Sequence, residues 1–145
     1  MGNSFIVRVS TAELSQALKS IDLYDGKTRL KVEKALLGGT RRVASGARTR
    51  VAVRSGKLKR SIKTSFSRVK LEGQVKAVQP YAPLVEFGTR PHKIPSKKKK
   101  LKVNGQIVSG DVQHPGSKAR PFLIPAFEAE APNITKDVLK AVEKP

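Results

Sequence analysis

The stretch from Tyr81 to Phe127 constrains the fold of this chain more than any other part of it. It contains six of the nine prolines, both histidines and most of the aromatic residues. Proline fixes the backbone angle φ and removes a hydrogen-bond donor, and the neighbouring glycines favour defined turns. We therefore expect this stretch to hold one conformation, with the remaining elements packed against it.

The composition predicts a folded chain with a modest core. The sequence has 145 residues, is 38% hydrophobic and contains five Phe, two Tyr and no Trp, so aliphatic side chains must fill most of that core. This length predicts one domain. The absence of cysteine excludes disulfides and thiolate metal sites. No apolar run reaches the roughly 20 residues of a membrane span, and the N-terminus lacks a signal-peptide pattern.

The formal net charge of +19 is concentrated in two regions. Residues 27–70 contain 15 Lys or Arg and one acid, Glu33, whereas residues 90–120 contain nine Lys or Arg and one acid, Asp111. This clustering predicts acidic partners, either nucleic acid or negatively charged protein surfaces.

Local patterns predict three elements in the first part of the chain. The β-rich run Phe5–Val9 is an expected strand, and a short helix follows from Ser10 or Thr11 to about Ile21. A long amphipathic helix is expected over residues 27–53, with a bend or break at Gly38-Gly39 and with Glu33 and Thr40 interrupting its apolar side. The apolar side consists of Leu30, Leu36, Leu37, Val43, Ala44, Ala47 and Val51. The cationic side consists of Lys27, Lys31, Lys34, Arg41 and Arg42.

The second part of the chain alternates short strands with short helices. Two antiparallel strands are expected between Ile62 and Val78, joined by a turn at Glu72-Gly73. The spacing in Tyr81–Phe87 favours a short helix that ends at Gly88. Asn104-Gly105 predicts a two-residue hairpin. Two C-terminal helices are expected, one over residues 122–131 and one that Asn133 caps.

Together these elements predict an α+β fold. It comprises a small, mostly antiparallel sheet with the long helix packed across it, an extended β-hairpin loop and C-terminal helices. The expected parts of the domain are the N-terminal strand and short helix (1–26), the long basic helix (27–54), the strands and central motif (55–89), an extended basic hairpin arm (90–118) and the C-terminal helices (119–145).

The residues indicate no catalytic or metal site. His92 and His114 could bind a metal with Asp111, but two histidines 22 residues apart, in turns with proline, indicate structural or solvated side chains. We expect Glu86 to pair with an arginine rather than act as a general base, because no nucleophile or second carboxylate lies nearby in sequence. The chain has no nucleophile elbow, phosphate loop or dinucleotide fingerprint. We predict a protein that is not an enzyme and needs no cofactor.

Cations on the long helix and in the arm are the predicted contacts to DNA or to an acidic partner. The lysine run 97–100 is consistent with binding to DNA phosphate and, equally, with a solvated loop. No helix-turn-helix, finger or ribbon motif predicts base-specific readout. The predicted contact residues are Lys31, Lys34, Arg41, Arg42, Arg48, Lys97, Lys98, Lys99, Lys100 and Lys102.

Several motifs in a fixed order resemble a known family over about residues 27–130. Residues 53–62 look like its Thr/Ser-Gly-x-Leu-x-x-Ser-Ile segment, and Tyr81-Ala82 followed by Val85-Glu86-Phe87-Gly88-Thr89 looks like its central motif. Pro91-His92-Lys93-Ile94, the hairpin, His114-Pro115-Gly116, residues 120–123 and residues 125–127 complete the pattern. The chain is similar to the minor tail component or tail-completion (neck) proteins of long-tailed bacteriophages.

This resemblance implies a structural virion protein at the head-proximal end of the tail. Such proteins form rings, commonly hexamers, around the DNA channel, contact the connector and tail proteins, and assemble in the host cytoplasm. A tail-terminator ring and, in another class, a non-specific DNA-binding protein remain as alternatives. The residues assigned to the family motif and to assembly are Tyr81, Glu86, Phe87, Gly88, Thr89, His92, His114, Pro115, Gly116, Arg120, Pro121 and Phe122.

Overall fold

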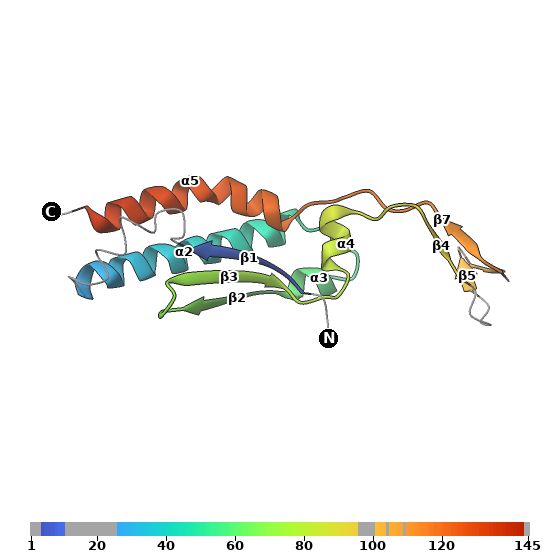
Figure 1. The fold of residues 1–145 in the computed structure, drawn as a ribbon, viewed down its shortest axis with the longest axis horizontal. Helices are drawn as coiled ribbons and strands as arrows, with labels where there is room; N and C mark the ends of the chain where they lie inside the picture. The colour runs from blue at the N-terminus through green and yellow to red at the C-terminus, as the bar shows by residue number, and fades with distance from the viewer. Residues whose placement is uncertain (1–3, 11–25, 96–100, 104, 109, 144–145) are drawn as a thin grey trace.

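The computed structural model describes residues 4–10, 26–95, 101–103, 105–108 and 110–143. Three layers form the body of the molecule: a three-stranded antiparallel sheet, the long helix α2 across it, and the C-terminal helix α5 over α2 (Figure 1). A narrow two-stranded arm projects from one end of this body (Figure 1). The predicted α+β fold is therefore confirmed. The expected helix between Ser10 and Ile21 lies outside the described residues.

The sheet has the order β1-β3-β2, with every neighbouring pair antiparallel. Its strands are β1 (Phe5–Ser10), β2 (Ile62–Ser67) and β3 (Glu72–Ala77). In the central strand, alternate residues Gly73, Val75 and Ala77 are buried, because successive side chains of a strand point to opposite faces. The strand predicted near Phe5 is confirmed as one edge of this sheet.

The turn predicted at Glu72-Gly73 is wrong, since both residues lie inside β3. The chain instead reverses over residues 68–71, where Leu71 has a φ of 49°. Gly73 serves packing rather than a turn. A Cβ at this position would overlap the side chain of Thr40, which belongs to α2. The glycine therefore lets the sheet approach the helix closely.

Helix α2 (Gly26–Arg50) runs through Gly38-Gly39 without a break. Its buried residues include Leu36, Val43 and Ala47, as expected from the apolar pattern. Thr40 is also buried, and its hydroxyl donates to the Leu36 carbonyl at 2.7 Å, which satisfies the polar group inside the apolar layer. Leu30 departs from the prediction, because 56% of it is exposed and Val32 occupies the core in that turn.

Helix α5 (Leu123–Val142) is one continuous helix where two were predicted. Pro132 lies inside it on the exposed side, so water can reach the carbonyl that loses its partner. Ile134 and Val138 are buried on the other side and hold the second half of the helix in line. A Cβ on Gly39 would come within 2.5 Å of Ile134 Cγ1, so the glycine permits close contact between α2 and α5.

Two short helices connect the sheet to the arm. Helix α3 (Lys57–Arg60) is one turn that precedes β2, where the sequence predicted a direct entry into the strand. Helix α4 (Ala82–Phe87) is confirmed, and Gly88 is its C-cap. The arm contains the pairs β4 (His92–Ile94) with β7 (Val112–His114), and β5 (Leu101–Val103) with β6 (Gln106–Val108). In the part of the chain that the structure describes, no helix meets the length and hydropathy of a membrane span.

A candidate assembly surface at α4 and the base of the arm

Helix α4 has an inner and an outer side that differ in polarity. Ala82 and Glu86, four residues apart, are buried against the body. Tyr81, Leu84 and Phe87 point outward and remain 40%, 52% and 60% exposed. Phe87 also meets the ring of Phe5 edge-on at 5.3 Å, which fixes the end of α4 against β1. A short helix that, with its N-cap Tyr81, leaves three large apolar side chains in solvent is a candidate contact surface.

The buried carboxylate of Glu86 caps the N-terminus of α5. Its Oε2 accepts hydrogen bonds from the backbone N–H groups of Phe122 and Leu123 at 2.9 and 3.0 Å. Its Oε1 accepts a hydrogen bond from the backbone N–H of Ile124 at 2.9 Å. The next residue is Pro125, which has no N–H to satisfy. One side chain therefore satisfies the amides that the first turn of a helix leaves without partners, and its negative charge suits the positive end of the helix dipole.

The prediction that Glu86 pairs with an arginine is wrong. Its partners are backbone amides 36 to 38 residues away, and no ion pair involves it among the described residues. Nothing in the local sequence identifies this role, because Phe122 is the N-cap residue and offers no capping side chain. The Arg120 N–H also donates to the Val85 carbonyl at 2.7 Å, so two neighbouring contacts join α4 to α5.

The base of the arm is a close crossing of two backbone segments. Thr89 and Ser117 exchange backbone hydrogen bonds of 2.9 and 3.1 Å, and their hydroxyls lie 2.9 Å apart. Gly88 and Gly116 flank this bridge, with φ of 73° and 82°. A Cβ on Gly88 would lie 2.6 Å from the Ser117 carbonyl oxygen. A Cβ on Gly116 would overlap the Thr89 carbonyl oxygen. Only glycine fits this crossing, in both space and backbone angle.

The two histidines stack against each other just beyond the crossing. Their ring centroids are 4.9 Å apart, and they are paired residues of β4 and β7. His114 Nδ1 accepts the Gly116 N–H at 3.0 Å across Pro115, and His92 Nδ1 lies 2.9 Å from the Arg90 carbonyl oxygen. Among the described residues, no group of three His, Cys, Asp or Glu side chains could hold a metal ion. The Asp111 carboxylate instead meets Lys93 Nζ at 3.0 Å across the ribbon.

The motif residues after the arm return the chain to the body. Phe122 is fully buried in the core, whereas the adjacent Pro121 and Arg120 are exposed. Arg120 lines an apolar pocket of about 330 Å³ together with Arg54, Leu58, Tyr81 and Val85. The apolar side of α4 thus continues into a recess with arginines at its edge.

The predicted cationic contacts divide into residues that extend into solvent and residues that bond to other parts of the body. Lys31, Lys34 and Arg41 are exposed on α2, as expected. Arg42 binds Glu130 and Asp137 of α5 at 2.9 and 2.7 Å, and the hydrogen bond to Glu130 raises the pKa of the guanidinium.

Arg48 also bonds within the body, since its guanidinium donates to the Ile62 carbonyl at 2.7 Å. Arg42 and Arg48 therefore help to hold the body together, and their role as partner contacts stays a prediction. Lys97, Lys98, Lys99 and Lys100 lie outside the described residues, and Lys102 is in β5.

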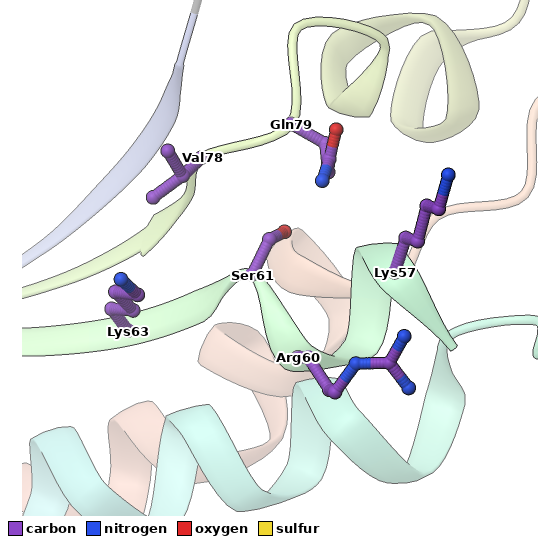
Figure 2. A pocket seen from close by; sticks show the side chains of 6 residues that line it. All are labelled: Lys57, Arg60, Ser61, Lys63, Val78 and Gln79. Carbon is purple, nitrogen blue, oxygen red and sulfur yellow. The ribbon is translucent and has the colours of Figure 1, made fainter. Parts of the chain in front are cut away.

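A second group of cations was not singled out from the sequence. Lys57, Arg60 and Lys63 surround a hollow of about 290 Å³, together with Ser61, Val78 and Gln79 (Figure 2). Figure 2 shows that α3 and β2 supply one wall and that the segment after β3 supplies the other. The Thr/Ser-Gly-x-Leu-x-x-Ser-Ile pattern marks α3, but only the pairing of β2 with β3 brings Val78 and Gln79 opposite it.

A comparison with family models gives a match to this chain. The model is described as "Bacteriophage HK97-gp10, putative tail-component" and covers residues 12–88. The match includes α2, the sheet strands β2 and β3, and α4 with its cap at Gly88. No curated protein and no solved structure matches the chain.

Proposed function

Because the chain belongs to the HK97-gp10-like family of bacteriophage tail components, we propose that it acts in the neck, where copies form a ring around the DNA channel. In this role it completes the head-proximal end of the tail or joins the tail to the head. Family membership places the protein among tail components, which implies contact with other tail proteins and a location in the virion.

The observation that carries the proposal is the exposed apolar side of α4 beside the fixed base of a projecting arm. Three large apolar side chains within the seven residues from Tyr81 to Phe87 are costly to leave in water and are typical of a buried interface. The Thr89–Ser117 bridge and the paired glycines hold the arm at a defined angle to this surface. A rigid projection next to an apolar patch supports contact between the arm of one copy and the α4 of the next.

Such a contact is heterologous, because two different surfaces of the same chain meet. A heterologous contact repeats around an axis and closes into a ring when the rotation permits. Contact between the arm of one copy and α4 of the next therefore supports a ring of identical subunits rather than a two-fold dimer. A hexamer is the stoichiometry that we expect.

A substitution on α4 tests the ring. Leu84→Asp should abolish assembly in native mass spectrometry and electron microscopy, since it places a charge in the proposed interface. The matched control is Val69→Asp, which alters an apolar residue that is 90% exposed on the distant β2–β3 turn. Normal rings from Leu84→Asp, or equal losses from both variants, would refute this interface.

Shortening the arm tests the other surface of the proposed contact, which is the arm itself. Residues 95–111 can be replaced by Asn-Gly, which keeps β4 and β7 paired and supplies a turn that suits a two-stranded ribbon. We expect a folded subunit that does not join virions. Infectious particles at normal yield would show that the arm beyond Ile94 is dispensable.

The tail-terminator and DNA-binding alternatives make different predictions. A map of the assembled neck would separate tail completion from tail termination by the position of the ring along the axis. The exposed cations Lys31, Lys34 and Arg41 support some affinity for DNA. A free DNA-binding protein would bind duplex tightly, with a steep salt dependence, and would form no rings.

A further inference from the structure

We propose that the hollow formed by Lys57, Arg60 and Lys63 binds carboxylates on an acidic, partly apolar segment of a different tail or neck protein. This inference rests on the chain being a tail component, but it does not require that the chain form a ring. The hollow and the contact surface on α4 are lined by adjoining parts of the chain, which meet between Gln79 and Tyr81.

The hollow has positive charge without a matching acid. No ion pair involves Lys57, Arg60 or Lys63 within the described residues. Lys63 is moreover directly opposite Lys76 in the β2–β3 register. Like charges directly opposite each other in a sheet are destabilising, so an anion bound here relieves a repulsion that the isolated chain must bear.

The walls of the hollow are fixed before any ligand binds. The Ser61 hydroxyl, within a residue that is 7% exposed, donates to the Leu58 carbonyl at 2.7 Å, and the Val78 N–H donates to the Ser61 carbonyl at 3.2 Å. Arg60 Nη2 donates to the Ser55 carbonyl at 3.3 Å. The Val78–Ser61 bond ties the end of α3 to the segment after β3, and the other two fix α3 itself, so little ordering of the backbone is needed on binding.

The surroundings favour a protein ligand over DNA. Val78 lines the hollow, and the apolar pocket beside Leu58, Tyr81 and Val85 begins on the same short helix α3. Phosphate backbones bind along cationic tracks and gain nothing from an apolar recess. An acidic segment with an apolar side chain can use both features, since anchors in apolar pockets dominate protein interfaces and charges at their rim select the partner.

A second copy of this chain lacks a suitable acidic surface among the described residues. Glu33, Glu72, Asp111, Glu130 and Asp137 form internal ion pairs, and Glu86 is buried as a cap. Glu128 and Glu143 are exposed without an ion pair, but they lie near opposite ends of α5. Two separated carboxylates do not complement a cluster of three cations, and the net charge of +19 opposes association through this site.

Charge reversal with a matched control tests the site. The probe is a labelled Glu-rich peptide with a central Leu-Phe pair, and binding to the full chain is followed by fluorescence anisotropy. Lys57→Glu/Lys63→Glu should lower the affinity by at least about tenfold. Both lysines are exposed in the free chain, but a bound peptide would shield their charge pairs from water, and such pairs are worth a factor of ten or more. Lys136→Glu/Lys140→Glu makes the same change in net charge on the exposed side of α5 and should lower the affinity by about twofold or less, as for screened surface charges.

Further probes decide between the possible ligands. A Glu-Ser peptide of equal charge should bind more weakly than the Leu-Phe peptide, and Lys57→Gln/Lys63→Gln should give an intermediate loss. Equal losses from the two charge-reversed variants would overturn the proposal. The proposal would also be overturned if duplex DNA bound the chain more tightly than the peptide and if Lys57→Glu/Lys63→Glu specifically lowered that affinity for DNA.

Self-association is measured separately on the same variants. Loss of rings from Lys57→Glu/Lys63→Glu with unchanged peptide binding would assign the hollow to a second copy and overturn this inference. Conversely, a protein that is monomeric yet binds the Leu-Phe peptide through the hollow would refute the proposed ring and leave the acidic partner supported.

Discussion

The body is held by buried aliphatic side chains, whereas the arm is held by hydrogen bonds between backbone segments. In the body, Leu36, Val43 and Val75 are completely inaccessible to solvent. In the arm, Ile94 and Val112 are only half-buried, and the Thr89–Ser117 bridge supplies the connection to the body. Both regions depend on glycine, but Gly39 and Gly73 make room for side chains, while Gly88 and Gly116 make room for the opposite backbone.

This difference predicts how each region responds to amino-acid substitutions. A packed layer of side chains can adjust its rotamers around a new group, but a backbone crossing offers no such adjustment. An arm with few buried apolar groups can also open without unfolding the body, because local stability follows local burial. Glu86 lies where the two regions meet, and changes there should affect both.

The largest effect is expected at Glu86. Glu86→Ala leaves three buried or half-buried amides at the start of α5 without their acceptor, which should lower the free energy of unfolding by about 3–5 kcal/mol. Urea denaturation followed by circular dichroism measures this loss. The control is Glu128→Gln on the exposed side of α5, expected to change stability by about 0.5 kcal/mol or less. Equal stability of the two variants would show that the cap contributes little.

A smaller and more local effect is expected at Gly88. Gly88→Ala forces a side chain into positive φ and against the Ser117 carbonyl, at a cost of about 1–3 kcal/mol. We expect faster hydrogen exchange at the amides of Thr89 and Ser117, while amides of α2 and β3 keep their protection. Loss of protection throughout the molecule would show that the arm and the body unfold as one unit.

The smallest effects are expected at the glycine pair in α2, and they should have opposite signs. Gly38→Ala meets only the end of the Arg42 side chain at 3.5 Å, so the gain in helix propensity should stabilise the protein by about 0.5–1 kcal/mol. Gly39→Ala collides with Ile134, which should outweigh that gain and cost about 1 kcal/mol net. Thermal unfolding of the two variants measures the difference, and a shift of the same sign in both would contradict the close packing of α2 on α5.

Local pattern was sufficient for most elements because their causes are local. The alternation in the strands, the apolar side of α2 and the glycine after Phe87 each act within a few residues, and the structure confirms β1, α2, α4 and the hairpin. The prediction failed where the same residues fit either a local or a tertiary explanation. Glu72-Gly73 has the composition of a turn, yet Gly73 lacks a side chain because Thr40 of α2 occupies that space. Pro132 is a helix breaker in sequence, yet α5 passes through it on its exposed side.

The sequence by itself determined the class of the fold, the positions of most of its helices and strands, the basic character of the chain and, through ordered motifs, its family. The tertiary structure decided which groups meet. It alone assigned Glu86 to the amides of α5, Arg42 to the acids of the same helix, and Lys57, Arg60 and Lys63 to one hollow. The physical reason is range: propensity and periodicity act along the chain, whereas hydrogen bonds and charges act between atoms that only folding brings together.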